Sequence, residues 1–241
     1  MAENVSAPKL PLSELCKAPG TVDLVVSKLR EIAPSDNVGD LINFSDDDGR
    51  TALHWAVALK NWALAESLLA GPLRASAESV DSDGATPLLT SCSVDPPQDL
   101  FHRLLAASGG PAALTVANQA GNTCLLVASS RGNASMIQCI LNASGPYAVE
   151  CLVHQNGTGQ SALHRAVAKG SMDAAEQLLF WSRKVLQKPQ QLTFVNLQDK
   201  VGDTALHYAS AENNQDMGQV LLRNGADRTK RNKKGNEFWE V

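Results

Sequence analysis

The sequence predicts an all-α solenoid with short β-hairpin-like turns, in which about six to seven helix–turn–helix units stack in one row. Two observations carry this prediction. A Gly-x-Thr or Gly-x-Ser step recurs along the chain, at Gly49, Gly84, Gly121, Gly159 and Gly202. Counted from the Thr or Ser of each step, an apolar pair follows after 17 or 18 residues. The pairs are Leu68-Leu69, Leu104-Leu105, Ile140-Leu141, Leu178-Leu179 and Leu221-Leu222. A register kept through five copies predicts a repeated structural unit.

Each unit is expected to open with a turn and a short first helix. Asp/Asn-rich stretches precede the glycines, as at 46–48 and 81–83, and such residues suit a hairpin-like turn. Thr51 then stands where a helix N-cap is wanted, because its hydroxyl can accept from an exposed amide. Leu53 and Val57 follow at helical spacing, which predicts a helix with one buried face.

The second helix of each unit is expected to carry the apolar pair. Asp95 and Pro96 are expected to supply the N-cap and the first-turn proline of one second helix. An insertion at 181–194 is expected to prolong another until Pro189 stops it. This insertion is interpreted either as an accessory contact or, more simply, as a tolerated surface excursion. Its basic residues are Arg183, Lys184 and Lys188.

These motifs resemble the ankyrin repeat, whose pattern runs D-x-x-G-x-T-P-L-H-x-A and continues to a Leu-Leu pair. "TALHWA", "SALHRA" and "TALHYA" match it well, whereas "TPLLTS" and "TCLLVA" place Leu89 and Leu126 where the pattern has histidine. The resemblance implies a single ankyrin-repeat domain at 11–241 after a disordered stretch at 1–10. The expected units are 11–47, 48–82, 83–119, 120–157, 158–200, 201–233 and a truncated cap at 234–241.

In an ankyrin-like stack, the residue after each histidine and the residue one helical turn later are expected to face a concave groove. Trp, Tyr and Arg are the usual energetic anchors of protein interfaces. The groove positions that we expect to contact a partner are Trp55, Arg131, Arg165, Lys169 and Tyr208. The histidines themselves are expected to be structural, bonding the capping residue and the neighbouring turn. They are His54, His164 and His207.

Composition and motifs exclude several function classes. The net charge of −4 argues against nucleic-acid binding, and no apolar run reaches the roughly 18 residues of a membrane span. Five cysteines without a C-x-x-C spacing indicate free thiols in the cytoplasm or nucleus. No nucleophile motif and no metal-ligand cluster is present, so we expect no enzymatic activity, no cofactor and no metal.

Three segments are similar to gankyrin-like proteins beyond what stacking requires: "DGRTALHWA" at 48–56, "ALHRAVAKG" at 162–170 and "VNLQDKVGDTALHYA" at 195–209. This resemblance implies a chaperone for assembly of the 26S proteasome regulatory particle. It would be a monomer outside the complex and would hold the C-terminal domain of a proteasomal ATPase-ring subunit in its groove. The runner-up hypothesis is an ankyrin adaptor that inhibits a kinase or a transcription factor.

The same resemblance implies which charged side chains meet the ATPase. Arg50 and Arg131 are expected to pair with carboxylates, and Arg165 and Lys169 extend this basic stripe. Acidic residues in the turns are expected to meet basic partner groups, namely Asp46, Asp48 and Asp83. The chain is acidic over 1–50 and basic over 223–241, which either orients an elongated partner or reflects solvated terminal units.

Overall fold

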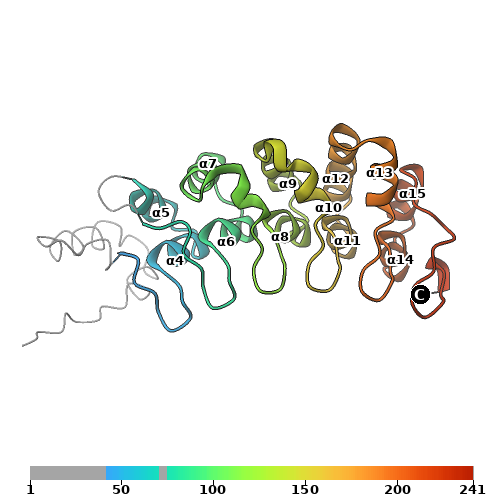
Figure 1. Ribbon diagram of the computed structural model, residues 1–241, viewed down its shortest axis with the longest axis horizontal. Helices are drawn as coiled ribbons and strands as arrows, with labels where there is room; N and C mark the ends of the chain where they lie inside the picture. Colours follow the sequence, from blue (N-terminus) through green and yellow to red (C-terminus); the bar gives the residue numbers. More distant parts are fainter. Residues whose placement is uncertain (1–41, 71–74, 241) are drawn as a thin grey trace, which may run out of the picture.

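The computed structural model describes residues 42–70 and 75–240, in which helices form two layers along one row (Figure 1). The first layer holds α4 (Ala52–Ala58), α6 (Pro87–Val94), α8 (Cys124–Arg131), α11 (Ala162–Ala168) and α14 (Ala205–Ala211). The second layer holds α5 (Trp62–Leu69), α7 (Gln98–Ala107), α9 (Ala134–Ala143), α12 (Met172–Val185) and α15 (Gln215–Arg223). Each first helix packs against the next one along the row. The predicted all-α solenoid is confirmed.

Further elements lie between these helix pairs or, for the last one, after the final pair. They are η1 (Gly110–Thr115), η2 (Gly145–Tyr147), α10 (Ala148–Val153), α13 (Lys188–Val195) and η3 (Phe238–Glu240). Over the described residues the β-type pairing is a single antiparallel bridge between Gln155 and Ser161. The expected disordered stretch at 1–10 and most of the expected unit 11–47 lie outside the described residues.

The apolar periodicity becomes one continuous core that runs the length of the row. Leu53, Leu68, Leu104, Leu178 and Leu221 are each 0% exposed and belong to it. Alanine and cysteine fill the narrow spaces between helices, and the four cysteines of the described residues are free and buried. They are packing residues of the apolar core.

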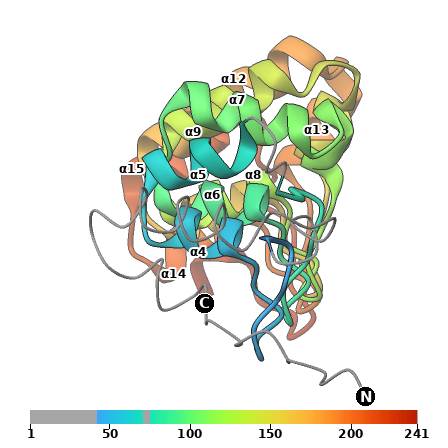
Figure 2. The same ribbon diagram turned by 90° about the vertical axis from the view of Figure 1, so that its left-hand side faces the viewer.

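The turns before the first helices project together from one side of the stack (Figure 2) and join edge to edge. The amide of one turn donates to a carbonyl of the preceding turn in every pair. The donor–acceptor pairs are Ser82 to Asp48, Gln119 to Asp83, Gly157 to Ala120, Lys200 to Thr158 and Lys233 to Val201, at 2.8–3.0 Å. This ladder fixes the spacing of the units.

The recurring glycine is required at this joint. Gly159 has φ +81°, a left-handed conformation that side chains other than glycine rarely adopt. A Cβ at this position would stand 2.7 Å from the amide nitrogen of Lys200 in the next turn. Backbone conformation and close approach therefore both explain the periodic Gly-x-Thr step.

The structure corrects two expected helix boundaries. Asp95 does not cap α7, which begins at Gln98 after Pro97; Asp95 instead ends α6 in a left-handed conformation, φ +60°. Pro97 disfavours helical backbone at Pro96, and Pro97 itself is extended, with ψ 140°, so the two prolines form a linker before the helix. Pro189 does not end α12, which stops at Val185. It lies in the first turn of α13, where a proline is well tolerated.

Candidate protein-binding surface

The three histidines of the first helices connect neighbouring units. In His54, Nδ1 accepts from the backbone amide of Thr51 at 3.2 Å, and Nε2 donates to the carbonyl oxygen of Ala85 at 2.9 Å. His164 makes the same pair of contacts with Ser161 and Asp203. His207 makes them with Thr204 and Asn236. Within the described residues no group of three His, Cys, Asp or Glu side chains could hold a metal ion. The predicted structural role of these histidines is confirmed.

Each first helix contributes two positions to a row along the first-helix layer. One is the residue after the histidine, or after the leucine that replaces it, and the other is the residue one helical turn later. The first set is half-buried: Trp55, Thr90, Val127, Arg165 and Tyr208. The second set is exposed except for the half-buried Val94: Leu59, Val94, Arg131, Lys169 and Glu212. Because consecutive first helices pack together, these ten positions make one continuous surface, called here the first-helix row.

At one end of this row, three of the predicted partner-binding residues bind one another. Trp55 Nε1 donates to Asp46 Oδ2 at 2.7 Å, and the Arg50 guanidinium lies 5.1 Å from the centroid of the Trp55 ring. Arg50 Nε also donates to Asp81 Oδ2 at 3.3 Å, and the Asp81 side chain is 3% exposed. This group therefore ties the first described turn to the second.

The carboxyl of Asp46 titrates below its usual range in this setting. Burial alone would raise its pKa, but hydrogen bonds from Trp55 and from the amides of Arg50 and Asp48, with the Arg50 charge, lower it. The carboxylate is therefore the form that organises the turn.

Arg165 and Tyr208, on the last two helices of the row, share a chain of hydrogen bonds. Arg165 Nη1 donates to Gln160 Oε1 at 3.1 Å, and Gln160 Nε2 donates to the Tyr208 hydroxyl at 2.6 Å. That hydroxyl donates to Asp199 Oδ2 at 2.9 Å. Burial raises the pKa of Tyr208 to about 12, so the phenol keeps its hydrogen.

The middle of the row carries cations that make no ion pair within the described residues. Arg131 and Lys169 are exposed and lie on neighbouring helices. A Cβ at Gly132 would stand 3.3 Å from Lys169 Cγ, so the lysine stem lies beside the residue that follows Arg131. Among the predicted acidic residues, Asp48 and Asp83 are exposed at the turn tips.

Sequence reasoning did not identify Asp81, Asp199 or Gln160, which hold the predicted side chains in place. The signal for the two aspartates was the opening residue of D-x-x-G. In Asp81 one carboxylate oxygen accepts the amides of Asp83 and Ala85, which leaves the other oxygen for Arg50. The same arrangement recurs at Asp199, whose second oxygen accepts from Tyr208.

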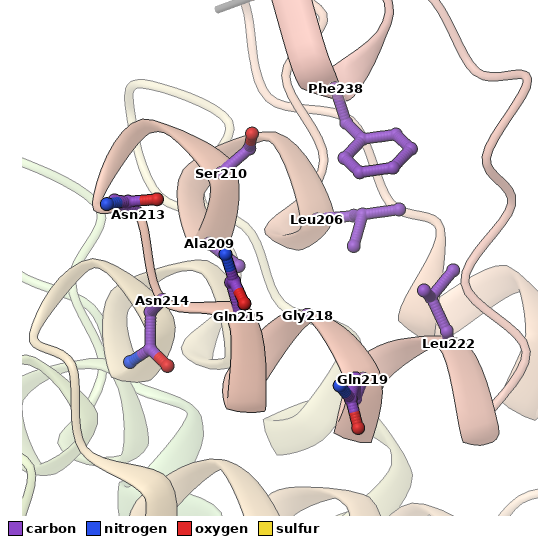
Figure 3. A pocket seen from close by; sticks show the side chains of 10 residues that line it. All are labelled: Leu206, Ala209, Ser210, Asn213, Asn214, Gln215, Gly218, Gln219, Leu222 and Phe238. Carbon is purple, nitrogen blue, oxygen red and sulfur yellow. The ribbon is translucent and has the colours of Figure 1, made fainter.

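Three surface hollows lie away from the first-helix row. One, of about 350 Å³, opens between α14, α15 and η3 and is lined by Leu206, Leu222 and Phe238 (Figure 3). It marks the end of the described stack, where the second helix of a further unit would pack. The second, of about 270 Å³, lies between α12, α13 and α15, and the third, of about 490 Å³, lies between α12 and α15. None of the described helices combines the length and the apolar character of a transmembrane helix.

Comparison with known proteins identifies the repeat. A model of three ankyrin-repeat copies matches residues 92–188, and a model of the single ankyrin repeat matches 48–82 and 201–233. The crystal structure of the ankyrin repeat domain of Bcl-3 superposes with a TM-score of 0.71. It covers 97% of this chain and 93% of that one at 21% identity, so this likeness shows the fold.

Two curated proteins are similar to this chain in sequence, but their names and their lengths differ from each other. The chain is 28% identical over 181 residues to the probable 26S proteasome regulatory subunit p28 of Saccharomyces cerevisiae, which covers 73% of this chain and 71% of that protein. It is 27% identical over 206 residues to the NF-kappa-B inhibitor zeta of Mus musculus, which covers 81% of this chain. The chain spans only 25% of that protein's length, and 8% to 38% of the other longer curated relatives that it matches.

Proteins of this type are generally non-catalytic scaffolds that bind other proteins through stacked repeats. The family models together match more than half of the chain, and the matched ranges coincide with the stacked helix pairs of the structure. The chain belongs to the ankyrin-repeat proteins.

Proposed function

We propose that this scaffold is a chaperone for assembly of the 26S proteasome regulatory particle and binds the C-terminal domain of a proteasomal ATPase-ring subunit along its first-helix row. The observation that carries the proposal is the match to the yeast p28 protein. It extends over 73% of this chain and 71% of that protein, so the two are alike over most of both lengths.

The charge of the first-helix row supports a partner with an acidic central surface. Arg131, Arg165 and Lys169 follow one another on α8 and α11, and no ion pair within the described residues neutralises them. On one side of this basic centre the turn tips are acidic, at Asp48 and Asp83. Complementary charges of this kind fix the register of a partner more than they set its affinity.

Arg50, Trp55 and Tyr208 have a different part in this proposal. Each is already held by a partner within the chain, so each presents a fixed surface instead of a free side chain. A half-buried aromatic ring in a fixed position loses little conformational entropy on binding, which favours a role as an anchor.

Affinity purification of the tagged chain from its native cells tests the proposal. We expect one proteasomal ATPase subunit to be recovered together with precursors of the regulatory particle. Purification of the charge-reversed Arg131→Glu/Lys169→Glu variant should recover less of that subunit. Recovery of other proteins without any ATPase subunit would refute the chaperone function.

A second candidate is an inhibitor of a transcription factor. The NF-kappa-B inhibitor zeta of mouse matches 81% of this chain, a larger share than the yeast protein matches. The same purification separates the two candidates, because this one predicts recovery of a transcription factor in place of the ATPase. Both candidates place the chain in the cytoplasm or the nucleus as a monomer before it meets its partner, which fluorescence imaging and light scattering of the purified chain would check.

A further inference from the structure

A second basic surface lies in the second-helix layer, over the ends of α12, α13 and α15. It consists of three cationic and two apolar side chains, Arg183, Lys188, Arg223, Phe180 and Leu192, and is called here the back patch. Phe180 is 51% exposed and Leu192 is 46% exposed. The helices that carry it lie in the layer away from the first-helix row (Figure 1).

The back patch is hollowed, because two of the surface hollows meet there. Arg183, Arg223 and Asn224 line both of them. The hollow of about 270 Å³ is completed by Lys188 and Leu192, and the hollow of about 490 Å³ by Phe180 and Glu176. The two adjoining depressions are therefore lined by three cationic side chains and by a single carboxylate, that of Glu176.

The position of α13 in the back patch is fixed by several contacts with the end of α15. Asn196 Nδ2 donates to the carbonyl oxygen of Gly225 at 2.8 Å, and Asn196 Oδ1 accepts the amide of Asp227 at 2.7 Å. A Cβ at Gly225 would stand 2.5 Å from Leu192 Cδ2, so Leu192 packs directly on this glycine. The depressions are thus part of the packed structure.

Arg183 is also held in place. Its Nη1 donates to Asn224 Oδ1 at 3.2 Å, which joins α12 to the residue after α15. A guanidinium that already makes one hydrogen bond in a set geometry still has donors for a carboxylate.

The charges of the back patch have no acidic partners within the described residues. The ion pairs of the described residues, Arg50 with Asp81 and Arg231 with Glu237, do not involve them. Helix macrodipoles explain cations in the last turns of α12 and α15, where Arg183 and Arg223 stand. They do not explain Lys188, which is the first residue of α13, at the helix end that disfavours a cation.

We propose that the back patch binds an acidic segment of a second protein, whose carboxylates meet the three cations and whose apolar side chains enter the two hollows. The chain as a whole is acidic, with a net charge of −4, so this concentration of positive charge is local. Two exposed apolar side chains beside it match a segment that alternates acidic and apolar residues. Because the patch and the first-helix row lie in different layers, both partners can bind together.

Fluorescence anisotropy of the full chain with a fluorescein-labelled peptide of Glu, Asp, Leu and Phe tests this proposal. We expect saturable binding, and a loss of about tenfold in affinity in the Arg183→Glu/Arg223→Glu variant. Lys233→Glu/Lys234→Glu is the matched control, since it makes the same charge change at an exposed turn. This control should bind within about twofold of the unchanged chain.

Two further measurements separate the two parts of the surface. Phe180→Ala keeps every charge and should still weaken binding, and a labelled peptide of Glu and Asp alone should bind more weakly than the mixed peptide. The absence of saturable binding, or an equal loss in both double variants, would overturn the proposal. Full displacement of the peptide by a single-stranded oligonucleotide would overturn it too, because the patch would then recognise phosphate.

Discussion

The Nε2 atom of His54 lies 2.9 Å from the carbonyl oxygen of Ala85, which is 31 residues further along the chain. A carbonyl oxygen only accepts, so Nε2 carries the hydrogen and Nδ1 is the acceptor for Thr51. One neutral imidazole thus connects the cap of its own helix with the turn of the next unit. The repeated histidine therefore connects neighbouring units through hydrogen bonds.

Replacing one of these histidines should weaken the stack. In His164→Leu, the Asp203 carbonyl and the Ser161 hydroxyl lose the contacts that they make with the ring. We expect a loss of about 2 kcal/mol in the free energy of unfolding, because buried polar groups would be left without partners. Urea unfolding followed by helical circular dichroism measures it, and an unchanged midpoint would show that the ring contributes no net stability.

Protonation of these histidines should also destabilise the protein. Burial is the main cause that lowers the pKa of His54 and of His164 below the ordinary value of 6.5. As the pH falls below 6.5, these histidines take up protons in the unfolded chain but not in the folded chain. The free energy of unfolding therefore decreases until the pH reaches the lowered pKa of the folded state.

We therefore expect the urea midpoint to fall between pH 7.5 and 5.5. The carboxyl of Asp46, whose pKa is lowered from 3.8, contributes only at more acidic pH. The double variant His54→Leu/His164→Leu, although less stable at both pH values, should show a smaller difference between them. An equal difference in the variant would assign the pH dependence to other groups.

A third prediction concerns a hydroxyl that the fold leaves without a partner. Thr123 Oγ1 is buried and makes no hydrogen bond, and Leu126 occupies the position that His54, His164 and His207 hold in their units. Thr123→Val keeps the shape and removes the unpaired hydroxyl, so we expect a gain of about 1 kcal/mol in stability.

The matched control is Thr204→Val. Thr204 Oγ1 lies 2.8 Å from Nδ1 of His207, so this change should lower stability by about 1 kcal/mol. Thermal unfolding of the two variants compares them directly. Shifts of the same sign would mean that hydroxyl pairing does not decide the outcome.

The sequence predicted the fold well because each unit repeats the same local requirements. Gly159 and its equivalents, the capping residues and the leucine pair are each fixed by a contact within the unit or with its neighbour. The boundaries at Asp95 and Pro189 were wrong, because proline ends one helix or begins another with equal local ease.

The surface positions were only partly predictable from the sequence. The period placed Trp55, Arg165 and Tyr208 in one row, as the structure has them. It gave no indication that Asp81 would bind Arg50 or that Asp199 would bind Tyr208, since these pairs depend on side-chain reach between turn and helix. Whether these side chains contact a partner stays a prediction.

A fourth prediction separates backbone strain from contact at the turn joint. Gly159→Ala and Gly170→Ala both put a side chain at positive φ, +81° and +72°, which costs about 1 kcal/mol. The Cβ at position 170 meets nothing within 4 Å, whereas that at position 159 stands 2.7 Å from the Lys200 amide. Gly159→Ala should therefore be the more destabilising by about 2 kcal/mol. Equal losses in urea unfolding would show that the turns can move apart freely.

The last prediction concerns the charges of the first-helix row. Arg50→Glu would place a carboxylate beside Asp81 and Asp46, so we expect this variant to lose stability as well as any partner contact. Arg131→Glu/Lys169→Glu changes exposed side chains that make no ion pair within the described residues.

The double variant should therefore keep the helical circular dichroism and the urea midpoint of the unchanged chain. Its affinity for the isolated C-terminal domain of a proteasomal ATPase subunit should fall by about tenfold, with a lower association rate whose salt dependence is weaker. Surface plasmon resonance at several ionic strengths measures both quantities. Lys233→Glu/Lys234→Glu is the control of equal charge, and an equal loss in it would show that net charge, and not the first-helix row, governs binding.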